Sequence, residues 1–549
     1  MAKKRRIAVP LRIVMMKSLF RRIKTESRHP PIESCIDGVC PDLSANRQVI
    51  LKSFGGSADL NLRQLHLGGS PGISMLVTYI DGLVNGQLVS ESVMKPIVTV
   101  GERLHERSHS AEQVYDHLKN HLLTGSQVKE ISRMTDLLQL VCAGNCAILI
   151  DGVASALACD TRGWNERSIE ESKTEPAIRG IREGFVETLR TNISMIRRRV
   201  KDPRLRIEEL SIGKISHTTV IITYIQGLAS ERTAQEARTR ISRVVTDFIL
   251  ESGNIEEYIE DAPLSPFPTV LRTDRPDRVI GSLYEGRIAI LIDGTPFALI
   301  VPCSLPMFLT AADDYNERSL IGSFLRALRY LLFVVSLTLP AFFVALITFH
   351  HEMLPTPLLL AIAAQREGVP FPALLEALIM EIAFEILREA SVRVPAFFGP
   401  AVSILGVLIL GQIAVSAGLV SPFMVIIIAL TAISSLSIPI YSMGMTIRLL
   451  RFLILVMSGS LGLLGFLSSI AAILIHLMTL RSFGLPYFTP FGPLIVPELK
   501  DSIIRAPWWS LRARPELLGG NDAVRQPAGQ MPAPPGSGTV NRPKREGNA

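Results

Sequence analysis

The chain has 549 residues, a formal net charge of +7, and 19% charged residues, against about 25% in average soluble proteins. Basic clusters occur at 3–6, 21–24 and 197–201, but no helix-turn-helix or RNP-type motif accompanies them, so we expect no nucleic-acid binding. Attraction to an anionic membrane surface is the favoured use of these clusters. Residues 1–329 are rich in charged residues, whereas residues 330–480 are poor in them. The predicted fold is therefore multi-domain, with a soluble half followed by an α-helical polytopic membrane domain.

The first 44 residues are predicted to be a basic N-terminal extension. Their apolar stretch Ile7–Phe20 is interrupted by Pro10, Arg12 and Lys17, which is atypical of a signal peptide. The cysteines form no C-x-x-C pair and have no nearby histidine partner, which predicts free thiols and no metal or cofactor. They are Cys35, Cys40, Cys142, Cys146, Cys159 and Cys303.

The soluble half contains an internal repeat. The pattern of residues 60–68 and 78–83 recurs at a constant offset in 205–213 and 223–228, and residues 144–152 recur as 286–294. Two copies of one unit are the simplest account of such self-similarity. We predict a duplicated cytoplasmic α/β domain, with subdomains at 45–160 and 200–305 joined by a helical connector at 161–199, in which 176–199 is helical.

Each copy contains residues that favour strands and helices in alternation. Ser74–Ile80 and Thr218–Ile225 are apolar and β-branched, which predicts buried strands. Ala147–Ile150 and Ala289–Ile292 are short apolar runs closed by Asp-Gly, which indicates turns. Residues 234–250 have apolar positions at helical spacing.

No catalytic motif stands out. Turn chemistry accounts for Asp151 and Asp293 more simply than catalysis does. The sequence has no P-loop, nucleophile elbow, HExxH or dinucleotide-binding fingerprint. We therefore expect that the protein is not an enzyme.

The membrane domain is expected over 330–480, after a juxtamembrane segment at 306–329. Uncharged runs predict about four spans, at 330–350, 398–419, 422–441 and 452–480. Arginines before the first span and after the last place the soluble half and the segment 481–514 in the cytoplasm. Small residues at Gly418, Gly459, Gly462 and Gly465 are candidates for close helix packing within a bundle or oligomer.

An acidic helix is predicted at 373–390, between two of these spans. Pro370 and Pro372 suit a helix start and Pro395 its end, and all three are candidates for gating positions. Glu381, Glu385 and Glu389 are spaced four residues apart and share one face. Carboxylates at membrane depth are costly and mark ion pathways, so this stripe is the candidate ion path.

An alternative has the same helix lying at the membrane interface, with its acids solvated or paired to Arg388 and Arg393. We expect about four spans plus an interfacial or re-entrant helix. If the acidic helix were a fifth span, Arg388 and Arg393 would be well placed inside, but the C-terminus would lie outside. Four spans leave the opposite difficulty, because Arg448 and Arg451 then fall on the outer side.

Three segments resemble one family. Residues 367–395 read EGVPFPALLEALIMEIAFEILREASVRVP and resemble the hallmark segment of the A subunits of GerA-type spore germinant receptors. Residues 180–199, GIREGFVETLRTNISMIRRR, resemble a second signature of that family, and 314–330 resembles its approach to the first span. The resemblance covers roughly 50–510. The Pro-rich tail 515–549 lies outside it and is expected to be disordered.

The resemblance implies a subunit of the inner spore membrane that works with a transporter-like B subunit and a lipoprotein C subunit. It implies a homo-oligomeric, nutrient-gated channel for monovalent cations that triggers germination, with the soluble half in the spore core. A paralogous group of the same family, tied to stage V sporulation, shares these motifs. A secondary transporter and a non-conducting membrane scaffold remain alternatives.

Overall fold

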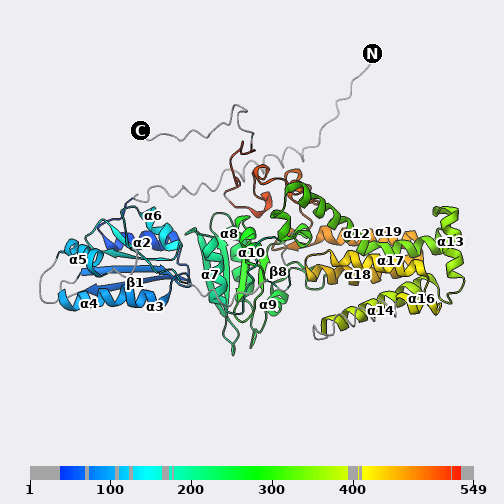
Figure 1. The fold of residues 1–549 in the computed structure, drawn as a ribbon, viewed down its shortest axis with the longest axis horizontal. Coiled ribbons are helices and arrows are strands. Elements are labelled where there is room, and N and C mark those ends of the chain that lie inside the picture. Colours follow the sequence, from blue (N-terminus) through cyan, green and yellow to red (C-terminus); the bar gives the residue numbers. More distant parts are fainter. Residues whose placement is uncertain are drawn as a thin grey trace, which may run out of the picture.

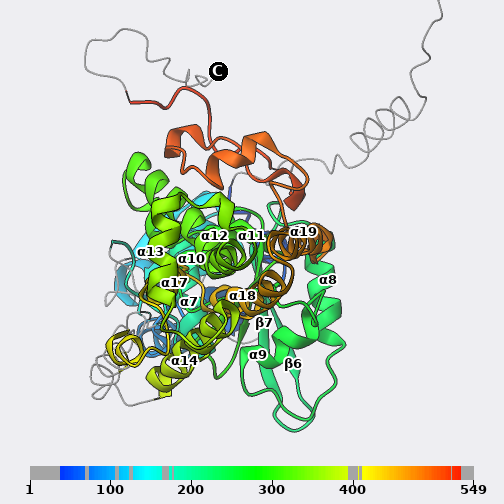
Figure 2. The same cartoon turned by 90° about the vertical axis from the view of Figure 1, so that its right-hand side faces the viewer.

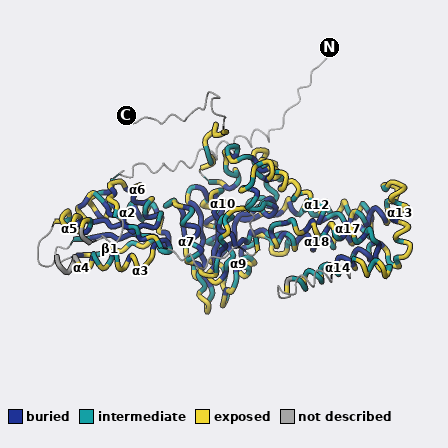
Figure 3. The backbone as a smooth tube through the Cα atoms, in the orientation of Figure 1, coloured by how far each residue is buried: buried dark blue, intermediate teal, exposed yellow. Residues whose placement is uncertain are grey.

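The computed structural model describes residues 38–67, 73–104, 110–122, 128–163, 172, 174–175, 179–393, 406, 411–520 and 522–532. Pro395, most of the predicted span 398–419, nearly all of the N-terminal extension and the end of the tail lie outside these residues. Two sheet-containing units and a helical bundle follow one another along the longest axis of the molecule (Figure 1). Buried residues concentrate in the sheets and in the middle of the bundle (Figure 3).

The first unit is a five-stranded sheet in the order β1-β2-β4-β5-β3, with every pairing antiparallel. All six residues of β4 are buried, as expected for a central strand with both faces covered. The strands are β1 (Leu60–Leu67), β2 (Ile73–Ile80), β3 (Val128–Ile131), β4 (Asn145–Ile150) and β5 (Ala156–Asp160). The helices are α2 (Leu43–Phe54), α3 (Gly86–Leu88), α4 (Lys95–Leu104), α5 (Ala111–His117) and α6 (Met134–Cys142).

The second unit repeats this architecture, with strand order β6-β7-β9-β10-β8 and antiparallel pairing throughout. Its strands are β6 (Leu205–Ile212), β7 (Thr218–Ile225), β8 (Leu271–Thr273), β9 (Ile288–Ile292) and β10 (Ala298–Val301). Its helices are α7 (Leu189–Arg199), α8 (Glu231–Ser242), α9 (Ser252–Ile259), α10 (Pro276–Tyr284) and α11 (Leu305–Leu309). The strands expected from the sequence are confirmed, but α8 ends at Ser242, so the helix expected over 234–250 is too long.

The two Asp-Gly turns have equivalent positions in the two units. Asp151 accepts a hydrogen bond from the N–H of Leu43, the first residue of α2, at 3.1 Å. Asp293 accepts one from Leu189, the first residue of α7, at 3.3 Å. Each carboxylate therefore satisfies a free N–H at a helix N-terminus, which is a structural role. Duplication as the origin of the two units stays a prediction.

A buried ion pair joins the two units. Arg197 of α7 donates to both carboxylate oxygens of Asp59, at 2.7 and 2.9 Å, and to the hydroxyl of Ser57. Arg197 and Asp59 are 1% and 6% exposed at their side chains. Among the described residues of the predicted connector 161–199, the helix α7 begins at Leu189 and ends at Arg199.

The bundle is organised around α12 (Ser319–Phe349), which packs against α14, α17, α18 and α19. The other helices are α13 (Thr356–Arg366), α14 (Ala373–Arg393), α16 (Ala414–Ser416), α17 (Pro422–Leu436), α18 (Tyr441–Leu461) and α19 (Leu463–Thr479). Among the described residues, α12 and α18 are long and apolar enough to cross a membrane, while α17 and α19 are shorter apolar helices. About four spans therefore remains a prediction.

The segment of the predicted span 452–480 is divided between two helices, α18 and α19. The chain turns at Gly462, whose φ of 63° falls in a region that favours glycine, and α18 and α19 pack against each other as a hairpin. After α19 the chain returns to the second unit, where the hydroxyl of Ser482 accepts a hydrogen bond from the N–H of Cys303 at 3.0 Å. The two sheet-containing units and the C-terminal segment therefore lie at the same end of the bundle (Figure 1).

Candidate functional site

The predicted acidic helix corresponds to α14, which lies on the flank of the bundle beside α18 (Figures 1 and 2). Pro370 and Pro372 lie just before it, and the carbonyl of Pro372 accepts the hydrogen bond of the Glu376 N–H at 3.0 Å. Proline fits there because the first turn of a helix needs no N–H donor. Ile382 and Ile386 are 50% and 65% exposed. One face of α14 thus packs on the bundle while an apolar face stays uncovered.

Glu381 forms the most deeply buried ion pair of this helix. Its Oε2 lies 2.7 Å from Nη2 of Arg451 on α18, and the two side chains are only 2% and 6% exposed. Glu381 Oε1 and Arg451 Nε, both buried, have no hydrogen-bond partner among the described residues. Removing either partner of such a buried pair strongly destabilises a protein, because the remaining charge is left uncompensated.

Glu385 repeats the contact one helical turn later. Its Oε1 lies 2.5 Å from Nη1 of Arg448, and its side chain is 35% exposed. Arg388, also on α14, donates a hydrogen bond from Nη1 to the hydroxyl of Ser435 on α17 at 3.4 Å. Since Glu381 and Glu385 meet Arg451 and Arg448 in reverse order, α14 and α18 run antiparallel.

Glu389 ends the stripe in a different environment. It pairs with Arg393 of its own helix at 2.6 Å, and the two side chains are 57% and 77% exposed. Exposed pairs four residues apart contribute only about 0.3–0.5 kcal/mol. The structure thus brings all three predicted glutamates onto α14, in a gradient from buried and paired to solvent-exposed.

Glu376 is a further carboxylate of α14, outside the predicted glutamate stripe. It is fully buried, and its Oε1 accepts hydrogen bonds from the N–H and hydroxyl of Ser421 at 2.6 and 2.5 Å. Ser421 caps α17, so the carboxylate lies at the positive end of that helix. Its other oxygen lies 3.6 Å from Nε of Arg366. Glu376 therefore ties α14 to α13 and α17.

The arginines opposite the stripe were visible in the sequence but not recognised as its partners. The alternative interpretation foresaw the pairing of Glu389 with Arg393, but paired no residue with Arg448 or Arg451. Their spacing of three residues in an otherwise uncharged helix matches glutamates four residues apart on a facing helix. That complementarity is the signal by which they can be found.

The four predicted packing glycines occupy different environments. A Cβ on Gly459 would lie 2.5 Å from the side chain of Leu374 on α14, and one on Gly465 would lie 2.0 Å from the carbonyl of Met457. Gly462 forms the α18–α19 turn, and Gly418 lies in the turn after α16 with a φ of 67°. Two of the four thus lie at close helix contacts and two in turns.

Neither a metal cluster nor a reactive thiol emerges from the described part of the chain. It contains no group of three or more His, Cys, Asp or Glu arranged to hold a metal ion. The cysteines it includes are free, and burial raises the pKa of Cys142 and Cys159 to about 12. Protonated, buried thiols of this kind are inert.

Comparison with known proteins identifies one family over most of the chain. Residues 48–517 match the family described as Bacillus/Clostridium GerA spore germination protein. The chain is 44% identical over 511 residues to spore germination protein KA of Bacillus subtilis, covering 93% of both chains. It is 37% identical over 478 residues to spore germination protein GerLA of Bacillus cereus, covering 87% of this chain and 96% of that one.

The chain is also similar to a membrane protein and to a solved domain. The uncharacterized membrane protein YfkQ of Bacillus subtilis is 40% identical over 480 residues, covering 87% of this chain and 91% of that one. The crystal structure of the N-terminal domain of the A subunit of the Bacillus megaterium spore germinant receptor GerK3 matches with 31% identity and a TM-score of 0.40. That match covers 49% of this chain and 98% of the solved one.

Proposed function

The chain belongs to the GerA family of spore germination proteins, and on that premise we propose that it is the membrane subunit of a nutrient germinant receptor that conducts cations. The relatives named as spore germination proteins support a role in germination. The finer proposal is a homo-oligomeric channel for monovalent cations in the inner spore membrane, with the soluble units facing the spore core. It includes a transporter-like B subunit and a lipoprotein C subunit as partners.

The observation that carries the channel proposal is the pairing of the glutamate stripe with arginines of α18. Glu381 and Glu385 contact Arg451 and Arg448 at 2.7 and 2.5 Å. While these contacts persist, each carboxylate is neutralised and offers little attraction to a cation. Separation of α14 from α18 exposes the carboxylates, and rings of acidic side chains attract cations into a pore. The paired arrangement is therefore the closed state in this proposal.

The exposed parts of α14 support assembly into an oligomer. Ile382 and Ile386 form an uncovered apolar face next to the solvent-exposed Glu389. In a ring of copies, this face packs against a neighbouring subunit or lipid, and Glu389 lies at one end of the path. Nutrient binding to the partner opens the path only if it stabilises the separated arrangement over the paired one.

Planar-bilayer recording of the chain, alone and with its partner subunits, tests the proposal. We expect discrete, cation-selective openings that require nutrient. Joint replacement Glu381→Gln, Glu385→Gln and Glu389→Gln should lower conductance and cation selectivity. The matched control replaces Glu209 and Glu257, exposed residues of the second unit, by Gln.

Three results contradict the proposal. Saturable flux without discrete openings would indicate a secondary transporter. Silence even with all partners would indicate a scaffold. Unchanged conductance and selectivity in the triple glutamine variant would remove the stripe from the ion path.

A further inference from the structure

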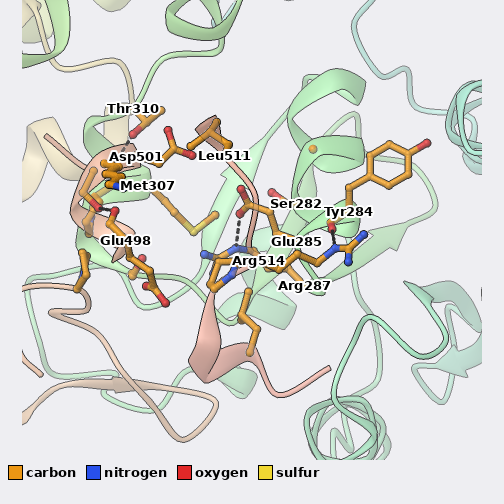
Figure 4. A pocket seen from close by; sticks show the side chains of 18 of the residues that line it. Ser282, Tyr284, Glu285, Arg287, Met307, Thr310, Glu498, Asp501, Leu511 and Arg514 are labelled. Atoms are coloured by element: carbon orange, nitrogen blue, oxygen red, sulfur yellow. Dashed lines mark hydrogen bonds and ion pairs between the residues drawn. The ribbon is translucent and has the colours of Figure 1, made fainter. Parts of the chain in front are cut away.

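A large cavity lies outside the helical bundle, where the second unit meets the end of the chain (Figure 4). Its volume is about 810 Å³, and it lies between α10, α11 and residues 485–520 and 522–525, here called the covering segment. Cavities of about 300–1,000 Å³ with apolar walls and a few convergent polar groups are typical of small-molecule sites. The cavity shares no residue with the glutamate stripe.

One wall is apolar and another is cationic. Met307, Leu511 and Leu518 supply apolar surface. Four of the five arginines that line the cavity form the cationic wall, and Figure 4 labels two of them beside the carboxylate of Glu285. These arginines are Arg287, Arg512, Arg514 and Arg525.

Glu285 engages these arginines weakly. Nε of Arg287 and Nη2 of Arg525 lie 3.4 and 3.5 Å from its two oxygens. Arg514 is held elsewhere, since its Nε donates to the carbonyl of Tyr284 at 3.0 Å. The guanidinium of Arg512 has no hydrogen-bond or ion-pair partner among the described residues. Guanidinium donors of the cluster thus remain available on the cavity wall.

Most of the other acidic groups on or beside the wall already have partners. Asp277 pairs with Arg275 at 2.7 Å, while Glu516 is exposed to solvent. Asp522 pairs with Arg514 at 3.1 Å.

Asp501 is committed to Arg326 at 3.1 Å and to the hydroxyl of Tyr315 at 3.0 Å. Glu498 accepts the backbone N–H of Glu516 at 2.8 Å. Burial raises the pKa of both carboxyl groups.

We propose that this cavity binds a phosphate-bearing molecule, with the phosphate on Arg512 and Arg525 and an apolar part against Met307 and Leu511. Planar guanidinium groups match phosphate oxygens in pairs, and such charge-assisted bonds are about twice as strong as neutral ones. The ligand is either a soluble phosphorylated compound or a lipid headgroup. The second source is within reach because the covering segment contacts the start of α12, where the N–H of Arg505 donates to the Ser323 hydroxyl at 3.1 Å.

Binding at this place joins two parts of the molecule. The covering segment contacts α10 of the second unit through Arg514 and the first helix of the bundle through Arg505. A ligand held between Arg512, Arg525 and the wall of α10 therefore ties the second unit to α12. This inference does not depend on the channel proposal.

Trp508 lines the cavity and provides the readout. The chain has three tryptophans, so Trp164→Phe with Trp509→Phe leaves Trp508 as the single emitter. The full chain in phosphatidylcholine nanodiscs is titrated with inorganic pyrophosphate. We expect the emission of Trp508 to change and to saturate as pyrophosphate binds. In the Arg512→Gln/Arg525→Gln variant the dissociation constant for pyrophosphate should rise at least about tenfold, because charge-assisted hydrogen bonds are lost.

Arg243→Gln is the matched control, because Arg243 is an exposed arginine at the end of α8, outside the cavity. Nanodiscs containing phosphatidylglycerol separate the two sources: weaker apparent pyrophosphate binding there indicates a lipid headgroup, and unchanged binding indicates a soluble ligand. Protection of the covering segment from protease by pyrophosphate gives a second readout. The proposal is overturned if neither readout saturates, or if the double variant binds as tightly as the Arg243→Gln control.

Discussion

Replacement of Arg451 by methionine tests how the structure holds α14 against α18. Methionine fills part of the volume of arginine but leaves Glu381 without its counter-charge. The pair is 2% and 6% exposed and its atoms are 2.7 Å apart, so the carboxylate cannot regain water without moving α14. Loss of one partner of such a buried pair costs about 3–5 kcal/mol.

That free energy is large on the scale of a conformational equilibrium. Since about 1.4 kcal/mol corresponds to a factor of ten, the paired arrangement should lose more than about a hundredfold in population relative to any arrangement that hydrates Glu381. We expect Arg451→Met to lower the unfolding temperature and to raise cation conductance in the absence of nutrient.

Two further variants isolate the electrostatic cause. Glu381→Leu combined with Arg451→Met removes both charges and should recover most of the stability, because an apolar pair has no desolvation cost. Arg393→Met removes the partner of Glu389 on the same helix, where the exposed pair is worth about 0.5 kcal/mol or less.

Unfolding temperature in one detergent and basal open probability in planar bilayers are measured for all three variants. If Arg451→Met behaves like Arg393→Met in both assays, the pair does not hold α14 in place. If the double variant is as unstable as Arg451→Met alone, lost packing rather than lost charge is the cause.

Other predictions concern the soluble units and the α18–α19 turn. Arg197→Met leaves Asp59 buried without its partner, so the free energy of unfolding should fall by about 3–5 kcal/mol, and a denaturation midpoint equal to that of the unmodified chain would contradict this. Burial, and then the charge of Glu260, raises the pKa of Glu256 from 4.5 to about 7. The folded state therefore binds the proton more tightly, and stability falls as pH rises from about 4.5 to about 7. Glu256→Gln removes that loss, so the unfolding temperature of the variant minus that of the unmodified chain should be larger at pH 8 than at pH 5. An equal difference at both pH values would refute the assignment. Gly462→Ala forces a side chain into a backbone region that glycine favours and should cost about 1–3 kcal/mol, which increased protease cleavage at the turn would report.

The sequence predicted the strands well because strand formation follows from the residue types within each short segment. The apolar, β-branched runs at Ser74–Ile80 and Thr218–Ile225 form β2 and β7, as expected. Apolar composition alone did not predict where a helix breaks. Residues 452–480 are uniformly uncharged, and only the backbone of Gly462 separates α18 from α19.

The pairing of the glutamate stripe depends on long-range packing, which periodicity along one helix does not contain. Spacing places Glu381, Glu385 and Glu389 on one face, and the structure keeps them there. Whether that face meets solvent or arginine depends on a helix more than sixty residues later in the chain. Side-chain exposure rises along α14 from 2% at Glu381 through 35% at Glu385 to 57% at Glu389, so the three glutamates differ although their spacing is regular.

The same packing removes a difficulty that the sequence raised. With four spans at the predicted positions, Arg448 and Arg451 fall on the outer side, against the usual cytoplasmic bias of arginine. In the structure α18 begins next to the second unit, where the hydroxyl of Thr446 donates to the carbonyl of Pro266. Arg448 and Arg451 therefore lie within the turns of α18 nearest the soluble units, at the end where the arginine bias places the cytoplasm. The hairpin at Gly462 then returns the chain to that end, so Arg448 and Arg451 no longer conflict with the cytoplasmic location of the sheet-containing units, which stays a prediction.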